Sequence, residues 1–218
     1  MAAGLGERLR PITDRWAKPV LPIDGQPVIV TLLHELAAAG IERTVVVTGH
    51  LAEQVEALVE PLPYDIRFVR QPQPLGSADA VLRAGAAPPF LALAADTRFA
   101  HGDVARFVAA AGNADGAVAI RRQPGRPDHT RVSVREGRIV SFKDGDAPGD
   151  WTAAPVMALG ARVAAFLDPL PGKPPYELVD VFQLAIDNGA AVSAIQVRRT
   201  RDITSPVDLV RENFPYLR

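Results

Sequence analysis

Short apolar runs alternate with segments of helical periodicity between residues 27 and 122, and this alternation limits the fold more than any other feature of the sequence. The runs that predict strands are RTVVVTG (43–49), YDIRFVRQ (64–71), PFLALAAD (89–96) and GAVAIRR (116–122). The segments that predict helices are 27–39, 51–60, 76–85 and 102–111. Strands joined by helices form right-handed crossovers. We therefore expect an α/β fold, with a mostly parallel twisted sheet covered by helices on both faces.

The pattern changes after residue 122. The stretch TRVSVREGRIVSFKDG (130–145) alternates on both sides of Glu136-Gly137, which predicts a β-hairpin. A strand is expected at 152–160, with Pro155 placing it at a sheet edge or a bulge. The remaining expected elements are a helix at 176–189, a strand at 191–197 and a helix at 206–213. With no linker or internal repeat, residues 1–218 are expected to form one domain with a small mixed β subregion.

Composition excludes several classes of function. The formal net charge is −1, so no global field attracts the protein to nucleic acid or to a membrane surface. The absence of cysteine excludes disulfides and thiolate metal sites, which fits a cytoplasmic protein. No stretch of 18 apolar residues predicts a membrane span. Any anionic ligand must therefore be bound by a local cluster of basic residues.

Such a cluster occurs in the opening stretch AAGLGERLRPITDRWAKPVLPIDGQPVI (2–29). A P-loop is excluded because its pattern is not present, and a dinucleotide-binding loop because Leu9 stands where it needs its third glycine. Gly4 and Gly6 nevertheless allow backbone amides to approach an anion. From Glu7 to Lys18 the sequence has four basic residues and two acidic ones, a local net charge of +2. The stretch is thus either an anion-binding loop or a solvated basic loop.

The same stretch resembles the signature of the sugar-phosphate nucleotidyltransferases, a glycine pair followed by R-L-x-P-x-T and then K-P. Three further segments are similar to that family in the same order: QPQPLGSADAV (71–81), FLALAADTRF (90–99) and RDITSPVDLVREN (201–213). The resemblance covers nearly the whole chain. It implies a Rossmann-like fold and a reaction in which an NTP and a sugar 1-phosphate give an NDP-sugar and pyrophosphate.

The resemblance also implies roles for individual residues. Arg8 and Lys18 would be catalytic, facing the departing pyrophosphate and the α-phosphate, and Asp96 and Asp202 would hold Mg²⁺. The nucleotide would be bound by Ala3, Gly4, Gly6, Gln71 and Gly76. Lys143 would be either the residue that binds the sugar phosphate or a solvated lysine of the hairpin. The nucleotide-binding part would extend over about residues 1–122 and the sugar-phosphate-binding part over about 123–218. The nucleobase, the sugar and the oligomeric state are not specified.

Several positions depart from the family pattern. Glu7 stands where threonine or serine is usual, and Pro155 and Thr204 stand where glycine is usual. The family also has several strand residues before the first motif, where this chain has Met1, so we expect an upstream extension of about five to eight apolar residues. The departures leave three alternatives open. They are an active sugar-phosphate transferase, a catalytically weakened nucleotide-sugar-binding or regulatory homologue, and a transferase acting on a non-sugar alcohol phosphate such as phosphocholine.

Overall fold

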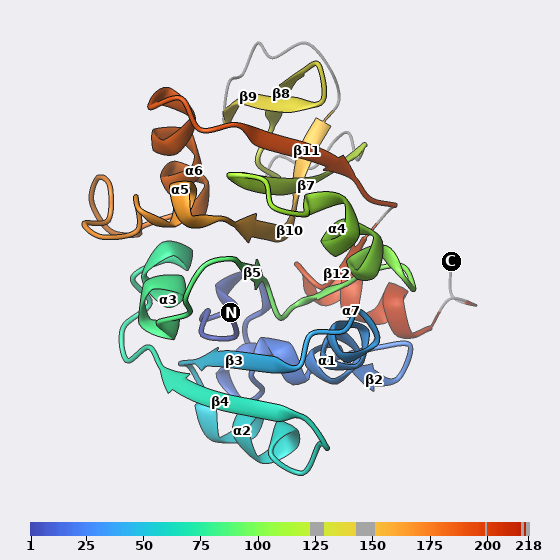
Figure 1. Cartoon of the computed structure of the whole chain (residues 1–218). Coiled ribbons are helices and arrows are strands. Elements are labelled where there is room, and N and C mark those ends of the chain that lie inside the picture. Colours follow the sequence, from blue (N-terminus) through green and yellow to red (C-terminus); the bar gives the residue numbers. More distant parts are fainter. Residues whose placement is uncertain (123–128, 143–150, 199, 215, 217–218) are drawn as a thin grey trace.

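The computed structural model describes residues 1–122, 129–142, 151–198, 200–214 and 216 (Figure 1). Its helices and strands confirm every strand and helix expected above, within one to three residues at most ends. The elements are η1 (Glu7–Leu9), η2 (Ile12–Asp14), η3 (Lys18–Val20), β1 (Pro22–Ile23), β2 (Gln26–Pro27), α1 (Val28–Ala38), β3 (Arg43–Thr48), α2 (Ala52–Val59), β4 (Asp65–Arg70), α3 (Ser77–Ala84), β5 (Phe90–Leu93), β6 (Thr97–Arg98), α4 (Asp103–Ala111), β7 (Gly116–Arg122), β8 (Val132–Arg135), β9 (Arg138–Phe142), β10 (Trp151–Leu159), α5 (Ala161–Ala164), α6 (Leu178–Asp187), β11 (Val192–Gln196), β12 (Arg201–Asp202) and α7 (Pro206–Asn213).

The largest sheet among the described residues has six strands, in the order β5-β10-β7-β11-β9-β8. The α/β class is confirmed, and the strand directions are more mixed than the sequence predicts. The ladders β3·β4 and β7·β11 are parallel, whereas β10 runs antiparallel to both β5 and β7. Helical crossovers make neighbouring strands parallel, but β10 follows the β8–β9 hairpin and enters the sheet in the opposite direction.

Helices cover both faces of this sheet, as expected. Along β7, Ala117 and Ala119 belong to one buried cluster with α1 and α4, and Val118 and Ile120 to another with α5 and α6. Successive side chains of a strand point to opposite faces, so β7 is apolar throughout because both of its faces are buried. Within the described part of the chain, none of the helices combines the length and apolar character needed to cross a bilayer.

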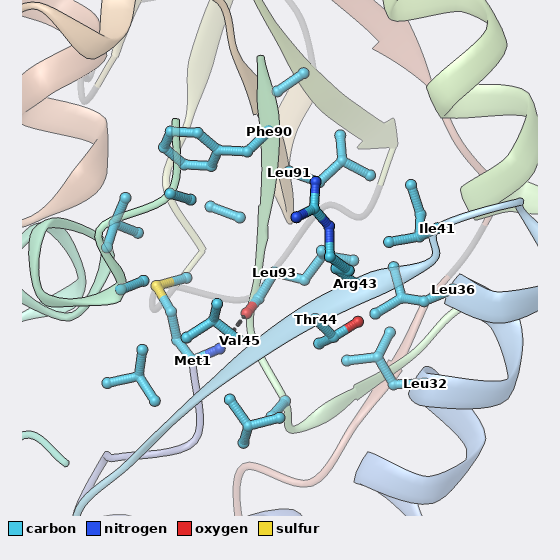
Figure 2. Close-up of a pocket in the computed structure, with 18 of the residues that line it drawn as sticks. Met1, Leu32, Leu36, Ile41, Arg43, Thr44, Val45, Phe90, Leu91 and Leu93 are labelled. Atoms are coloured by element: carbon cyan, nitrogen blue, oxygen red, sulfur yellow. Dashed lines mark hydrogen bonds between the residues drawn. The ribbon is translucent and has the colours of Figure 1, made fainter. Parts of the chain in front are cut away.

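The parallel pair β3–β4 lies beside β5 without pairing with it. Among the described residues, Met1 and Ala2 link the two strands: Ala2 forms a parallel bridge with Thr48 of β3, and Met1 contacts β5 through its backbone. Beyond Met1 an apolar cavity of about 380 Å³ separates the facing edges of β3 and β5 (Figure 2). At the carboxyl end of β5, Met1 and Ala2 therefore link it to β3, whereas at its amino end the cavity separates the two strands.

Two local predictions were specific enough to test. The β8–β9 hairpin turns at Glu136 and Gly137, both with positive φ, as the Glu-Gly pair indicates; its expected end at 143–145 lies outside the described residues. Pro155 lies in a bulge of β10, where the register against β7 shifts between Ala153 and Met157. A proline has no N–H to donate to a ladder, so the bulge accommodates it within an interior strand.

Candidate functional site

The opening loop is held in place by apolar residues that alternate with its charged ones. Leu9, Leu21 and Ile23 are buried in a cluster with Val28 and Ile203. Glu7 and Arg8, which precede Leu9 on η1, are exposed, as are Arg10, Asp14 and Arg15 between Leu9 and Leu21. Burial of the leucines and isoleucines thus fixes the loop while its polar side chains face solvent, which is the arrangement that an anion-binding loop needs.

Gly6 has a structural reason to be glycine. Its φ is +65°, a conformation that side chains with a Cβ rarely adopt. A Cβ at this position would lie 2.7 Å from Thr13 Cγ2, and the Thr13 hydroxyl donates a hydrogen bond of 2.9 Å to the Gly6 carbonyl. Gly4, by contrast, is exposed and has open space around it. Gly6 therefore closes the loop, and Gly4 leaves its backbone accessible to a ligand.

Lys18 and Asp96 form a salt bridge, although they are far apart in the sequence. Lys18 begins η3 at the end of the opening loop, and Asp96 follows β5. The Thr97 hydroxyl also donates to Asp96 Oδ1 at 3.2 Å. Both members of the salt bridge keep some exposure, 18% for the Lys18 side chain and 29% for that of Asp96. The structure thus brings a predicted phosphate-binding cation and a predicted metal ligand into direct contact.

Asp202 reaches the same region through a two-residue ladder. β12 pairs antiparallel with β6, and Asp202 lies opposite Thr97, the residue after Asp96. The Thr204 hydroxyl donates to Asp202 Oδ2 at 3.0 Å. Because opposite residues of a ladder have Cα atoms about 5 Å apart, the two predicted metal ligands lie within one residue of each other in register. Sequence reasoning placed both at strand ends but did not predict the ladder that joins them.

His129 is a neighbour of this pair that the sequence analysis did not assign to the site. Its side chain is 7% exposed, and its Nε2 lies 3.8 Å from Asp202 Oδ2. The guanidinium of Arg121 lies 3.1 Å from the same ring nitrogen. No motif surrounds His129, and a single histidine without ligand spacing gives no signal in a sequence. It adds a buried nitrogen to the environment of Asp202.

The residues at this position fit a magnesium ion. Across the described residues, no group of three or more His, Asp or Glu side chains is arranged to hold a metal, so protein ligands would not surround an ion. Mg²⁺ is usually bound by one or two carboxylates together with waters and substrate phosphates. Asp202 lies opposite Thr97, the residue after Asp96, so Asp96 and Asp202 are the two carboxylates here that could take part in such a site.

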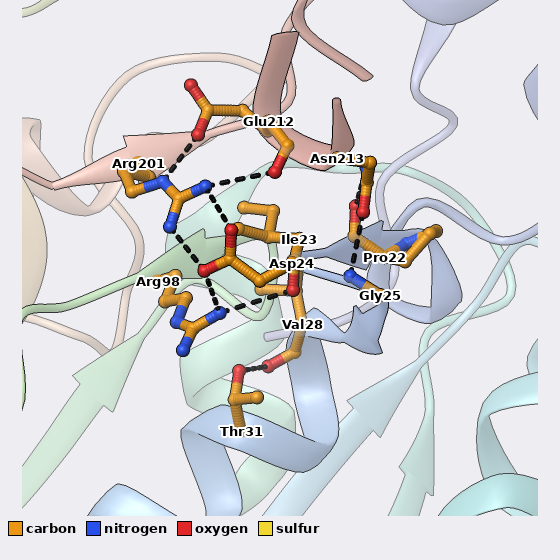
Figure 3. A network of polar contacts seen from close by, with 10 residues as sticks. All are labelled: Pro22, Ile23, Asp24, Gly25, Val28, Thr31, Arg98, Arg201, Glu212 and Asn213. Carbon is orange, nitrogen blue, oxygen red and sulfur yellow. Dashed lines mark hydrogen bonds and ion pairs between the residues drawn. The ribbon is translucent and has the colours of Figure 1, made fainter. Parts of the chain in front are cut away.

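A network of ion pairs around Asp24 and Arg201 holds the β6–β12 ladder in place (Figure 3). Asp24 accepts hydrogen bonds from Arg98 at 2.7 Å and from Arg201 at 2.8 Å, and Arg201 also pairs with Glu212 of α7. The hydrogen bond to Asp24 raises the pKa of the Arg201 guanidinium above its usual value. Arg98 and Arg201 are directly opposite each other in the ladder. One carboxylate thus joins β12, which contains Asp202, to β6, which begins directly after Asp96.

Asp24 occupies the turn between β1 and β2, with φ of +52° next to Gly25 at +72°. An Asp-Gly pair in a two-residue connection is a strong hairpin signal. The sequence PIDGQP therefore contained a local clue to this turn. Nothing in it indicated that the aspartate would bind two arginines from distant segments.

Gln71 and Gly76, the predicted base-reading residues, contact each other. Gln71 is 5% exposed, and its Nε2 donates to the Gly76 carbonyl at 3.0 Å and to Asp79 Oδ2 at 2.7 Å. Both amide hydrogens have partners in this way, so Gln71 would meet a base through its carbonyl oxygen as an acceptor. Gly76 has φ of +106°, and a Cβ there would lie 2.2 Å from the Tyr176 carbonyl oxygen. Packing alone thus requires glycine at this position.

Two of the predicted residues, Ala3 and Lys143, are not among these contacts. Ala3 is buried and packs against Gly49, where an added Cβ would lie 2.8 Å from the Cβ of Ala3. Its backbone follows the Met1–Ala2 segment into the loop. Lys143, the predicted sugar-phosphate residue, lies outside the described residues. The site that the structure assembles is therefore the opening loop, Lys18, Asp96 and Asp202, with His129 beside them.

Residues 1–172 match the family described as the MobA-like NTP transferase domain. The chain is 32% identical over 215 aligned positions to the bifunctional protein GlmU of Acidovorax ebreus, covering 89% of this chain and 44% of that protein. A stretch of 63 positions is 46% identical to the 2-aminoethylphosphonate cytidylyltransferase of Lancefieldella rimae, covering 29% of this chain and 26% of that protein. The chain thus spans less than half the length of these two relatives.

Among solved structures, the inositol-1-phosphate CTP transferase from T. maritima has the same fold. It superposes with a TM-score of 0.83 at 21% sequence identity, covering 95% of this chain and 88% of that one. An identity this low supports the fold alone, and nearly the whole chain takes part in it.

Proposed function

The chain belongs to the family of MobA-like NTP transferase domains, and from this premise we propose that it transfers a nucleoside monophosphate from an NTP to a sugar 1-phosphate. The products are an NDP-sugar and pyrophosphate. An oxygen of the acceptor phosphate attacks the α-phosphorus of the NTP, the bond from that phosphorus to the bridging oxygen breaks, and pyrophosphate leaves with the bonding electron pair. The family match and the identity to GlmU confirm the resemblance of the opening stretch to the sugar-phosphate nucleotidyltransferases.

This reaction needs no protein base. The second pKa of a phosphate monoester is about 6, so the attacking oxygen is already ionised near neutral pH. The chain's contribution is then to hold two anions in line and to balance the charge that develops on the leaving group. The exposed backbone at Gly4 and the exposed side chain of Arg8 offer donors for the triphosphate. Lys18, at the far end of the loop, offers an ammonium beside the α-phosphate.

The observation that carries the proposal is the convergence of Lys18, Asp96 and Asp202. Three segments that are distant in the sequence meet there through one salt bridge and one ladder. Mg²⁺ bound between the two carboxylates would neutralise phosphate charge during the transfer. Asp96 would then exchange part of its contact with Lys18 for the ion, which would leave the ammonium available to the nucleotide.

A second candidate acceptor is an amino-alcohol phosphate or phosphonate. The identity of 46% to a protein named as a 2-aminoethylphosphonate cytidylyltransferase favours it, although the match covers 29% of this chain. Such an acceptor presents the same phosphorus oxyanion to the site, so the transfer chemistry is unchanged. Phosphocholine belongs to this class. The non-catalytic alternative is a protein that binds a nucleotide sugar without turning it over.

The test is a screen for pyrophosphate release. The purified chain is incubated with each of the common NTPs and a panel of sugar 1-phosphates, 2-aminoethylphosphonate and phosphocholine, with and without Mg²⁺. We expect Mg²⁺-dependent release with at least one NTP and one sugar 1-phosphate. Release with the amino-alcohol compounds alone would select the second acceptor class. Binding of nucleotide without release for any pair would support the non-catalytic alternative and overturn the proposal.

A further inference from the structure

Asp79 is a buried carboxylate to which the transfer reaction proposed above gives no role. It lies in the first turn of α3, eight residues after Gln71, and it is 6% exposed. A buried carboxylate is costly unless hydrogen bonds and a cation stabilise its charge. The groups that stabilise it therefore indicate what it does.

Arg83 and Gln71 both donate hydrogen bonds to this carboxylate. Asp79 Oδ2 accepts from Arg83 Nε at 2.6 Å and from Gln71 Nε2 at 2.7 Å. Burial alone would raise the pKa of the Asp79 carboxyl, but the two hydrogen bonds and the charge of Arg83 together lower it below its ordinary 3.8. Asp79 is therefore ionised at neutral pH, and its oxygens can only accept hydrogen bonds.

The orientation of the Gln71 amide is fixed by two acceptors next to its NH2 group. Nε2 donates to Asp79 Oδ2 and, at 3.0 Å, to the carbonyl oxygen of Gly76. Turning the amide over would place its oxygen against a carboxylate and a carbonyl, neither of which can donate. The main chain of Gln71 is held as well, because its N–H donates to Thr48 O at 2.7 Å. Gln71 thus has one stable orientation.

The amide oxygen is the part of Gln71 that is left for a ligand. Among the described residues, none donates a hydrogen bond to Gln71 Oε1. This oxygen is also not one of the described buried side-chain atoms that are closed off from solvent without a partner. Oε1 is therefore an accessible acceptor on a side chain that is otherwise buried.

An acceptor at a fixed position distinguishes between two bases of the same ring class, the pyrimidines or the purines. Cytosine has an amino group where uracil and thymine have a carbonyl oxygen, and adenine has an amino group where guanine has a carbonyl oxygen. The neighbouring ring nitrogen is an acceptor in cytosine and adenine, whereas it carries a hydrogen in uracil and guanine. A fixed acceptor therefore binds one member of each pair and opposes the other, whereas an amide that turns freely serves both.

We propose that Asp79 determines nucleobase specificity by fixing the Gln71 amide with its oxygen toward the base, so that the site selects one base within a ring class. The inference rests on the proposed function, in which Gln71 reads the base of the NTP. Asp79 acts through Gln71 and does not touch the nucleotide, so it is a positioning residue. Its loss should change the choice between NTPs more than the binding of any one of them.

The experiment measures the affinity of the full chain for CTP, UTP, ATP and GTP by calorimetry, with Mg²⁺ and without an acceptor. The test variant is Asp79→Asn, because asparagine keeps the shape and can face Gln71 with either its oxygen or its NH2 group. The matched control is Arg83→Gln. It removes a charge from the same helix but leaves the Asp79 carboxylate and its hydrogen bond to Gln71 in place. Tm is measured for all three proteins.

The unmodified chain should prefer one member of a base pair of the same ring class by at least ~10-fold, as expected for a base-reading contact. Asp79→Asn should bring this ratio to within about 3-fold of unity, and Arg83→Gln should keep it within about 2-fold of the unmodified chain. Equal affinity of the unmodified chain for both members of each pair would overturn the proposal. So would an unchanged ratio in a folded Asp79→Asn variant, or an equal loss in Arg83→Gln. Selective binding without pyrophosphate release would contradict the proposed function instead and would support this inference.

Discussion

The two ends of β5 are held in opposite ways. At its carboxyl end, Ala94 and Ala95 donate hydrogen bonds to neighbouring segments on both sides, and Asp96 pairs with Lys18. At its amino end, Phe90 and Leu91 pair with β10 on one side and border the cavity on the other. Polar contacts from distant segments define the candidate site, whereas the cavity end depends on a single ladder. Changes at the two ends should therefore separate activity from stability.

The largest expected effect concerns the site end. Asp96→Asn and Asp202→Asn keep the side-chain size and remove the charge. Each should lower turnover by on the order of 10² or more, because each removes a main electrostatic contact of the transition state. Tm should change by no more than about 2 °C, since both carboxylates keep some exposure, 29% and 14%. Asp65→Asn, at the exposed start of β4, is the matched control and should leave both quantities unchanged.

The second prediction compares two leucines on neighbouring strands. Leu159 of β10 is fully buried, while Leu91 of β5 lines the cavity. Leu159→Ala should lower the free energy of unfolding by about 3 kcal/mol, within the range for well-packed leucines. Leu91→Ala should cost about 1 kcal/mol, because one side of its side chain already lacks neighbours. Urea denaturation measures both, and equal losses would show that the cavity end is packed as densely as the rest.

The third prediction concerns pH. Burial lowers the pKa of the Met1 amine to about 6 from its ordinary 8.0. The unfolded chain therefore binds more protons than the folded chain between these values, so stability rises from pH 6 to pH 8. The rise should be on the order of 2 kcal/mol, and this group should cause no further change in stability below pH 6, where it is protonated in both states, or above pH 8, where it is neutral in both. Urea denaturation at several pH values, compared with the N-acetylated chain, isolates it. An acetylated chain with the same rise would contradict the assignment.

The smallest expected effect concerns the network around Asp24. Asp24→Asn should lower the free energy of unfolding by about 1 kcal/mol, because Arg98 and Arg201 lose a shared charged acceptor. The Mg²⁺ concentration for half-maximal rate should rise a few-fold as the ladder loosens. Glu53→Gln, which removes an exposed partner of Arg70, is the control and should cost less than ~0.5 kcal/mol with no change in Mg²⁺ dependence. Identical behaviour of the two variants would remove Asp24 from the support of the site.

Much of the fold could be predicted because periodicity records burial. Strand β7 is buried at every position but its last, and helix α4 is buried along one face, so their patterns predicted both type and position. The direction of β10 could not be predicted, since no local pattern records whether a strand enters a sheet from one end or the other. Periodicity did not predict the cavity, which lies between two correctly predicted strands.

The candidate site was predicted residue by residue but not as an arrangement. Asp96 and Asp202 were selected from a family resemblance, and each follows or lies in a strand as expected. β6 and β12, which join them, are two polar residues long and have no periodicity to detect. His129 and Asp24 act through contacts with segments more than 70 residues away, and single polar residues carry no sequence signal for such contacts.

The most direct test of the central claim, that Asp96 and Asp202 act as one unit, is the rate of Mg²⁺-dependent pyrophosphate release by the double variant. If both carboxylates act through one ion, the double Asp96→Asn, Asp202→Asn variant should be within about 3-fold of the slower single variant. If instead the two losses multiply, the residues act separately. Nearly full activity of Asp202→Asn beside an inactive Asp96→Asn would contradict the pairing outright.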